Sequence, residues 1–187
     1  MAAATFYLAS NADDGSRLWL GIPQGTHVER IKTNDNSAVA RNAVNELTAC
    51  WHGSDVTLKK DGKMPDNDGF AIEKSGNDGG IVIKARRSAG LLYGAYELLR
   101  MQQTSGVIAE ERSEPDFEYR ILNHWDNPDG SVERGYAGKS IWKWDEINGD
   151  KGTMSIDLKE RLTTYARANA SIGINGSVLN NVNASPS

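Results

Sequence analysis

The sequence predicts an α/β (α+β) protein in two parts, a layer of helices on a sheet followed by a βαβ unit. Short apolar, β-branched runs alternate with longer segments in which apolar residues recur every three or four positions. Glycine-rich turns separate several runs, and an acidic stretch with Pro115 interrupts the pattern near mid-chain. These observations give two domains, residues 1–114 and residues 115–187.

The first domain begins with two short strand-like runs at residues 18–21 and 27–31. The next helix follows a cap at Asn36 or Ser37, and its apolar face consists of Val39, Ala43, Val44, Leu47 and Trp51. Residues 56–58 form a strand. Residues 69–73 and 81–85 form a hairpin, because the glycines and asparagine between them supply the positive φ angles of such turns.

A second helix of this domain begins with Ser88 as its cap and buries one apolar stripe. The stripe consists of Leu91, Leu92, Ala95, Leu98 and Leu99. Gly94 would let this helix approach the sheet closely. Tyr93 and Tyr96 are interpreted as packing residues, so this segment indicates domain order and carries no catalytic group.

The second domain follows an acidic linker at residues 110–116. Residues 119–122 form a strand, 123–150 a long functional loop, 157–171 a helix and 177–179 a second strand. Asp157 and Glu160 have capping-box spacing, and Gly173 ends the helix in the left-handed conformation. One side of the helix carries Leu158, Leu162, Tyr165, Ala166, Asn169 and Ile172. This order is one βαβ unit, which implies parallel strands.

Composition excludes two classes of partner. The formal net charge of -4 and the pI near 5.4 argue against nucleic acid, which requires a basic face. Nothing approaches 18 consecutive apolar residues, so no membrane span is expected. Cys50 is the single cysteine, which excludes an intrachain disulfide and fits a small core residue.

Two polar motifs each follow a predicted strand. Residues 119–140 combine an indole, an imidazole, carboxylates, an arginine and several glycines, where a surface turn would need only small polar residues. Residues 171–184 contain the second motif, Ser-Ile-Gly-Ile-Asn-Gly followed by Asn-Asn-Val-Asn-Ala. In barrel enzymes the site is assembled from the loops that follow the strands. A tryptophan face suits a sugar ring, and neighbouring polar groups suit its hydroxyls.

The first motif resembles the α-glucuronidases of glycoside hydrolase family 67, whose first barrel strand carries N-H-W-D-N-x-D-G-S-x-E-R-G-Y-A-G-[RK]-S. The second resembles the next helix-to-strand junction of that family. The resemblance implies an accessory α/β sandwich domain, then the first βαβ of a TIM (β/α)8 barrel. Because a complete barrel takes roughly 250 residues, the chain is expected to be a truncated, N-terminal part of a longer enzyme.

The resemblance also implies an activity: hydrolysis of α-1,2-linked (4-O-methyl)glucuronic acid from xylo-oligosaccharides, by inversion and without a cofactor. The family's catalytic acid and base lie on later strands, so no catalytic residue is assigned and the fragment is expected to be inactive. No metal site is predicted, since the calcium-like stretches at residues 66–69 and 126–130 lack the ligand spacing and are interpreted as turns. A homodimer of the intact enzyme stays open.

The family's motif tryptophan and the valine of its Asn-Asn-Val-Asn turn border the glucuronic acid pocket. The resemblance therefore places Trp125 and Val182 there. The further candidates for substrate binding are Asp126, Asn127, Glu133, Arg134, Asn181 and Asn183. An equally good interpretation of Asp126 and Glu133 is that one of them forms an ion pair with Arg134 and so shapes the loop. His124 is interpreted as an orienting residue.

Two other functions stay open from the residues alone. One is another glycosidase with a similar accessory domain, such as a β-N-acetylhexosaminidase-like enzyme, and the other is a non-catalytic carbohydrate-binding or protein-interaction module. The location is open as well. Residues 1–12 resemble a signal remnant, which would indicate a periplasmic or secreted protein, and otherwise the protein would be cytoplasmic.

Overall fold

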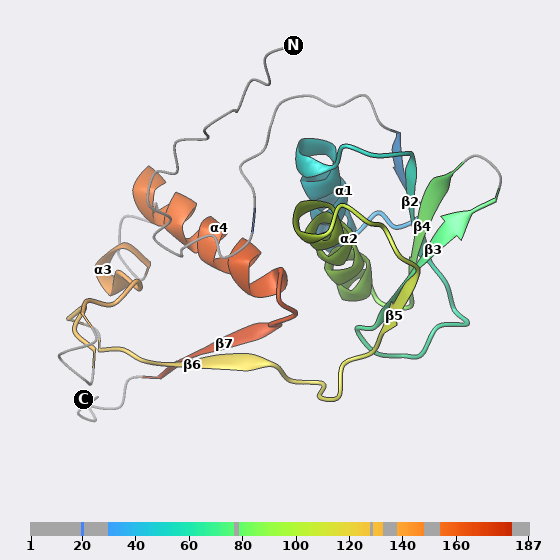
Figure 1. The fold of residues 1–187 in the computed structure, drawn as a ribbon. Helices are drawn as coiled ribbons and strands as arrows, with labels where there is room; N and C mark the ends of the chain where they lie inside the picture. Colours follow the sequence, from blue (N-terminus) through green and yellow to red (C-terminus); the bar gives the residue numbers. More distant parts are fainter. Residues whose placement is uncertain are drawn as a thin grey trace, which may run out of the picture.

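The computed structural model describes residues 20, 30–76, 79–127, 129–132, 138–147 and 154–180. Figure 1 shows two sheets with helices between and beside them. In chain order the elements are β1 (Ile31–Thr33), α1 (Ala38–Cys50), β2 (Val56–Lys60), β3 (Phe70–Ser75), β4 (Gly80–Ala85), α2 (Ser88–Thr104), β5 (Glu111–Ser113), β6 (Ile121–Trp125), α3 (Trp144–Ile147), α4 (Ile156–Ala170) and β7 (Gly176–Asn180).

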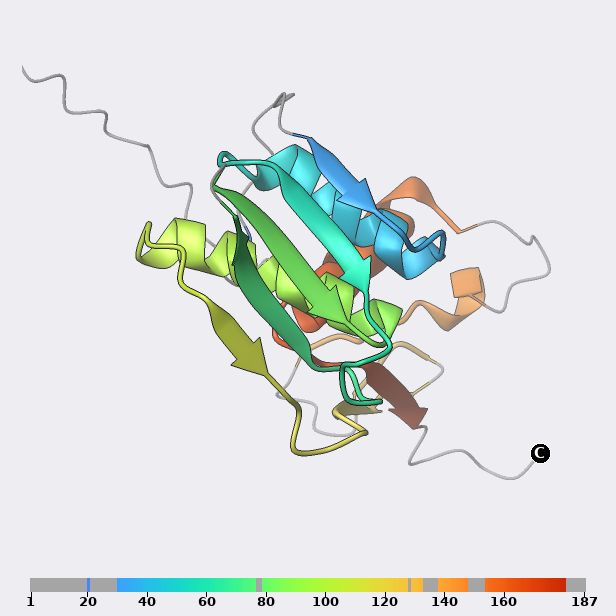
Figure 2. The ribbon, with the colours of Figure 1, turned by 90° about the vertical axis from the view of Figure 1, so that its right-hand side faces the viewer.

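The first domain is a mixed sheet of five strands in the order β1-β2-β4-β3-β5, covered on one face by α1 and α2 (Figure 2). β1, β2 and β4 are parallel, whereas β3 is antiparallel to β4 and to β5. The predicted hairpin is therefore confirmed as β3–β4. The prediction of a plain linker at residues 110–116 is wrong, because Glu111 pairs with Ile72 in edge strand β5.

The first strand also differs from its prediction. β1 begins at Ile31, the last residue of the predicted run 27–31, and continues to Thr33. Within the run 18–21 only Leu20 is described, and its side chain packs into the core. Arg30 is described but lies outside the strand, and residues 18, 19, 21 and 27–29 lie outside the described residues.

The helix caps follow the serines, with one exception. Ser37 caps α1, its hydroxyl accepting a hydrogen bond of 3.1 Å from the Ala40 amide. Ser88 does not cap α2, contrary to the prediction: Arg87 occupies the cap position, and the Ser88 hydroxyl donates to Asp35 Oδ2 at 2.5 Å. Donation to Asp35 does not by itself prevent capping, because the Ser37 hydroxyl also donates to Asp35 and still caps α1. Ser88 differs in its position, since it is the first residue of α2 and not the residue before it.

The core lies between the sheet and these two helices. α1 buries Ala40, Ala43, Leu47 and Cys50. The prediction that Cys50 is a small core residue is thus confirmed. Val39, assigned to the same face, lies at the rim of the interface. Glycine lets α2 approach the sheet, because a Cβ at Gly94 would lie 2.5 Å from Ile83 Cγ2.

The second domain contains the predicted βαβ unit. β6 and β7 are parallel, with Ile121 opposite Gly176 and Trp125 opposite Asn180. α4 connects them and is capped by Ser155, whose hydroxyl accepts from the Leu158 amide, so the capping box from Asp157 to Glu160 does not form. Gly173 follows the helix with a φ of 79°, the predicted left-handed turn.

Three ion pairs join the domains within the described residues, with α1 and α2 lying between the first sheet and α4 (Figure 1). The longest is between Arg87 and Glu118, at 3.8 Å. Arg167 of α4 donates two hydrogen bonds to Glu46 of α1, at 2.6 and 2.8 Å. Arg120, just before β6, donates to Asp68 Oδ2 at 3.0 Å and to the Gly173 carbonyl at 2.6 Å. Within the described ranges, no helix has the length and apolar character needed to cross a membrane.

Candidate functional site

The two faces of the β6–β7 pair carry different chemistry. Side chains alternate along a strand, and those of His124 and Ser177 contact Tyr165 of α4. Asn123, Trp125 and Val178 consequently point to the opposite face. Trp125 is 46% exposed there, at the C-terminal end of β6, where the motif analysis expected a sugar-binding surface.

Asp126 lies directly after Trp125 and is buried. Its Oδ2 accepts a hydrogen bond from the Ser140 hydroxyl, and its Oδ1 lies 4.0 Å from His124 Nδ1. Its backbone pairs with Val132 in an antiparallel bridge. These contacts give Asp126 a role in holding the loop against the strand end.

The loop after β6 is a turn stabilised by its own polar side chains. Asn127 donates from its amide to the Ser131 carbonyl and from Nδ2 to the Ser131 hydroxyl, both at 2.9 Å. Asp129 Oδ1 accepts from the Ser131 hydroxyl at 2.6 Å and from its amide at 2.9 Å, and these two bonds lower the pKa of Asp129. Gly130 adopts a φ of 81° at the bend.

A polar and aromatic cluster fills the space between β6, β7 and α4. The Tyr165 hydroxyl lies 2.5 Å from His124 Nε2 and 2.7 Å from the Ser177 hydroxyl. The indole of Trp142 packs edge-on against both His124 and Tyr165, with ring centroids 5.4 Å apart in each case. One tyrosine hydroxyl therefore links α4 to both strands.

Sequence reasoning missed this cluster. It assigned Tyr165 to the apolar stripe of α4 and gave no role to Ser140, Trp142 or Ser177. A signal was available: Tyr165 has a hydroxyl on the buried side of the helix, and strand alternation places His124 and Ser177 on the facing surface. Such a hydroxyl needs a partner when it is buried.

The end of the loop is fixed to the start of α4. Glu146 of α3 accepts hydrogen bonds from the hydroxyl and the amide of Ser155, the α4 cap, and from Lys143 at 3.1 Å. Hydrogen bonding from Ser155, followed by that from Lys143, lowers the pKa of Glu146. The loop is thus closed at both ends, by Asp126 at β6 and by Glu146 at α4.

The other predicted site residues cannot be compared with the geometry. Val182, Glu133, Arg134, Asn181 and Asn183 lie outside the described residues, and their assignments stay predictions. Among the residues that are described, no group of three or more His, Cys, Asp or Glu side chains could hold a metal ion.

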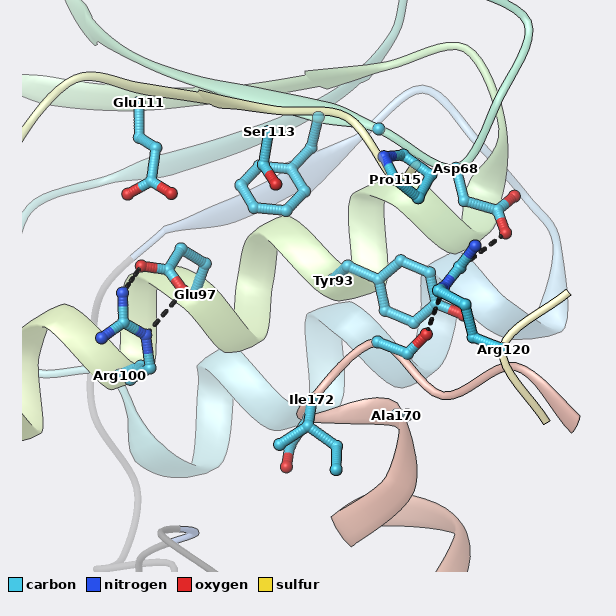
Figure 3. A pocket seen from close by; sticks show the side chains of 14 residues that line it. Asp68, Tyr93, Glu97, Arg100, Glu111, Ser113, Pro115, Arg120, Ala170 and Ile172 are labelled. Carbon is cyan, nitrogen blue, oxygen red and sulfur yellow. Dashed lines mark hydrogen bonds and ion pairs between the residues drawn. The ribbon is translucent and has the colours of Figure 1, made fainter. Parts of the chain in front are cut away.

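A cavity of about 380 Å³ lies at the other end of the strand pair, between α2, β5 and the turn after α4 (Figure 3). Arg120 closes one side through its ion pair with Asp68 and stands over the Tyr93 ring, 5.6 Å from its centroid. Glu97 and Arg100 form a second ion pair in its wall. Its charged groups are thus largely engaged with one another, and it lies away from Trp125.

The comparisons with known proteins concern both domains. Residues 99–187 match the family model of the glycosyl hydrolase family 67 middle domain. The chain is 44% identical, over 177 aligned residues, to a probable alpha-glucuronidase A of Aspergillus niger, an alignment that covers 88% of this chain and 20% of that protein. A probable alpha-glucuronidase A of Aspergillus terreus is 40% identical over 131 residues, covering 68% of this chain and 14% of that protein.

These relatives are much longer, and the chain spans a fifth of their length or less. Among solved structures, a family GH115 4-O-methyl-alpha-glucuronidase with specificity for decorated arabinogalactans superimposes with a TM-score of 0.46 and 14% identity. That superposition covers 83% of this chain and 25% of the other.

Proposed function

We propose that the full-length protein is an α-glucuronidase and that this chain supplies its accessory domain and the first strands of its barrel, because residues 99–187 match the family model of the glycosyl hydrolase family 67 middle domain. The substrate is a xylo-oligosaccharide that carries α-1,2-linked glucuronic acid or its 4-O-methyl ether. Trp125, Val182 and the polar residues around them form one wall of the glucuronic acid pocket.

The observation that supports this proposal most directly is the exposure of Trp125 at the end of β6. A flat indole that is left open at a strand end offers its face to the axial hydrogens of a sugar ring. The adjoining turn is fixed by hydrogen bonds, so it would present its polar groups without a large entropic cost on binding.

Catalysis by inversion needs an acid and a base about 6.5–9.5 Å apart, with a water between the base and the sugar. Asp126 is a poor candidate for either, because it is buried and its carboxylate is bonded to the Ser140 hydroxyl. Asp129 is held by Ser131 in the turn. As the resemblance to family 67 implies, we assign both catalytic groups to later strands of the full-length protein, with no cofactor required.

The test is the substitution Trp125→Ala in the full-length enzyme, assayed on aldouronic acids. We expect kcat/KM to fall. The loss of transition-state stabilisation should be about 2 kcal/mol or more, as for a large aromatic contact at a binding hot spot. Phe117→Ala is the matched control, since Phe117 is an exposed aromatic residue that precedes β6 rather than following it. Equal kcat/KM for the wild type and Trp125→Ala would show that Trp125 does not line the pocket.

The chain by itself gives a second test. Incubated with aldouronic acids, the purified 187-residue protein should release no glucuronic acid above a blank without protein. Release that scales with protein concentration would place an acid and a base within this chain. Binding of the oligosaccharide without hydrolysis, at the affinity of the intact enzyme, would instead favour a carbohydrate-binding module.

A further inference from the structure

We propose that Tyr165 is a positioning residue for Trp125: its hydroxyl, bonded to His124 and Ser177, fixes the end of β6 so that the indole projects from the opposite face. This inference rests on the proposed function for its consequence in catalysis. The structural part of the inference is that the Tyr165 hydroxyl, on one face of the strand pair, fixes the orientation of the Trp125 side chain on the other face. This part can be tested separately.

The first argument is the position of Trp125 between two anchored neighbours. His124 precedes it and is bonded to Tyr165, and Asp126 follows it and is bonded to Ser140. Both anchors lie on the helix side of β6, whereas Trp125 lies on the open side. Because backbone torsions on either side of a residue set the direction of its Cα–Cβ bond, fixing both neighbours fixes the base of the indole side chain.

The second argument is that Tyr165 contacts both strands of the pair within this chain. In the described chain, β6 and β7 form a sheet of their own with only each other as partners, and two-stranded sheets are marginally stable in water. The Tyr165 hydroxyl reaches one side chain on each strand, at 2.5 Å to His124 and 2.7 Å to Ser177. It therefore links His124, the neighbour of Trp125 in β6, to Ser177 near the start of β7, which pairs with Leu122.

The third argument is that the platform behind the hydroxyl is rigid. Tyr165 and Arg167 both belong to α4, and Arg167 binds Glu46 of α1 through two hydrogen bonds. The Trp142 indole packs edge-on against the Tyr165 ring and restricts its rotation. A restraint on Trp125 can thus be traced through Tyr165 to the core of the first domain.

The substitution Tyr165→Phe separates this role from simple packing, because it removes the hydroxyl and keeps the ring against Trp142. Thr163→Ala is the matched control. It removes another hydroxyl from α4, one that is exposed and bonded within the helix to the Lys159 carbonyl at 2.8 Å. Both variants retain the buried side chain of Leu158, so the docking of α4 is preserved.

The first measurement is ¹⁹F NMR of the 187-residue chain labelled with 5-fluorotryptophan, with the Trp125 resonance assigned through Trp125→Phe. We expect Tyr165→Phe to shift or broaden the Trp125 resonance, and Thr163→Ala to leave it unchanged. Trp142 touches Tyr165 and will respond in any case. A response of Trp142 with an unchanged Trp125 resonance would overturn the inference.

The second measurement is a double-mutant cycle in the full-length enzyme. If the hydroxyl acts through Trp125, Tyr165→Phe should lower kcat/KM by about threefold to tenfold in the wild type and have no effect in the Trp125→Ala background. An equal loss in both backgrounds would overturn the inference. Absence of α-glucuronidase activity in the wild type would instead refute the proposed function, and the NMR result would still decide the positioning role.

Discussion

The two domains bury their apolar residues very differently. In the first, the described strands and helices close around fully buried side chains such as Leu47, Leu58, Ile83 and Leu98. In the second, α4 buries only Leu158 and Ala168, and the large apolar residues of β6 and β7 stay partly exposed. These exposed residues are Ile121, Leu122, Trp125, Val178 and Leu179.

This difference follows from the number of layers that each sheet can form. The first sheet has five strands and two helices that cover one face, so most apolar side chains find partners within residues 30–114. The second sheet has two described strands with α4 on one face, and its packing relies on polar contacts through Tyr165, Arg120 and Arg167. The first domain is therefore stabilised by burial, and the second by hydrogen bonds and ion pairs to its neighbours.

Hydrogen exchange should give the largest contrast between the domains. The amides of residues 81–85 in β4 lie between β2 and β3 and should exchange only through global unfolding, which costs about 5–15 kcal/mol in typical domains. The amides of residues 177–179 in β7 should exchange faster by orders of magnitude. Equal, high protection of both strands in a monomeric sample would show that the second domain is complete by itself.

Replacing one leucine in each domain by alanine should lower the free energy of unfolding by different amounts. Leu98→Ala leaves a cavity in the closed core and should lower the free energy of unfolding by about 2–5 kcal/mol. Leu122→Ala removes a side chain that is 37% exposed and should cost about 1 kcal/mol or less. Urea denaturation of both variants provides the comparison, and similar losses would contradict it.

The ion pair between Arg167 and Glu46 should account for much of the docking between the domains. Glu46, through its hydrogen bonds, raises the pKa of Arg167 above its ordinary value, and an arginine is charged at usable pH even without this shift. Both side chains are mostly buried, and Arg167→Met should cost about 1–3 kcal/mol, between the values for exposed and buried pairs. The loss should appear as faster exchange in α4 while β4 is unchanged. Arg161→Met, on the exposed side of α4, is the control.

Acid should weaken the first domain by a smaller amount through Asp35. Burial acts to raise the pKa of Asp35, but hydrogen bonds from Ser88 and Ser37 outweigh it and lower the pKa. A carboxyl with a lowered folded-state pKa stabilises the fold above its unfolded pKa of about 3.9, and this contribution is lost as pH falls through the folded value. We measure the free energy of unfolding of the wild type and of Asp35→Asn by urea denaturation. Their difference should be about 1 kcal/mol at neutral pH and should shrink below about pH 4. A constant difference down to pH 2 would assign it to packing.

Sequence reasoning predicted correctly those elements whose conformation is decided by residues close together in the sequence. The hairpin β3–β4 follows from its glycine turn, the serine cap of α1 from Ser37, and the end of α4 from Gly173. The βαβ order and its parallel strands were predicted from the spacing of apolar residues. These features depend on a few neighbouring residues, whose backbone preferences differ by enough to decide the local conformation.

The errors occurred where contacts between distant parts of the chain decide the structure. Ser88 lies inside α2 and donates to Asp35, and residues 111–113 pair with β3 although their composition resembles a linker. The motif around Trp125 identified the candidate site, yet the contact of its neighbour His124 with Tyr165 was not predicted.

The sequence by itself determined the β3–β4 hairpin, the parallel βαβ unit and the resemblance to glycosyl hydrolase family 67, whose middle-domain model residues 99–187 match, because local periodicity and motifs are properties of consecutive residues. Only the tertiary structure decided which face of β6 holds Trp125 and which holds His124, and which hydroxyl fixes them. The physical reason is that strand alternation gives two equivalent faces, and only the docking of α4 on one of them makes the other the open one.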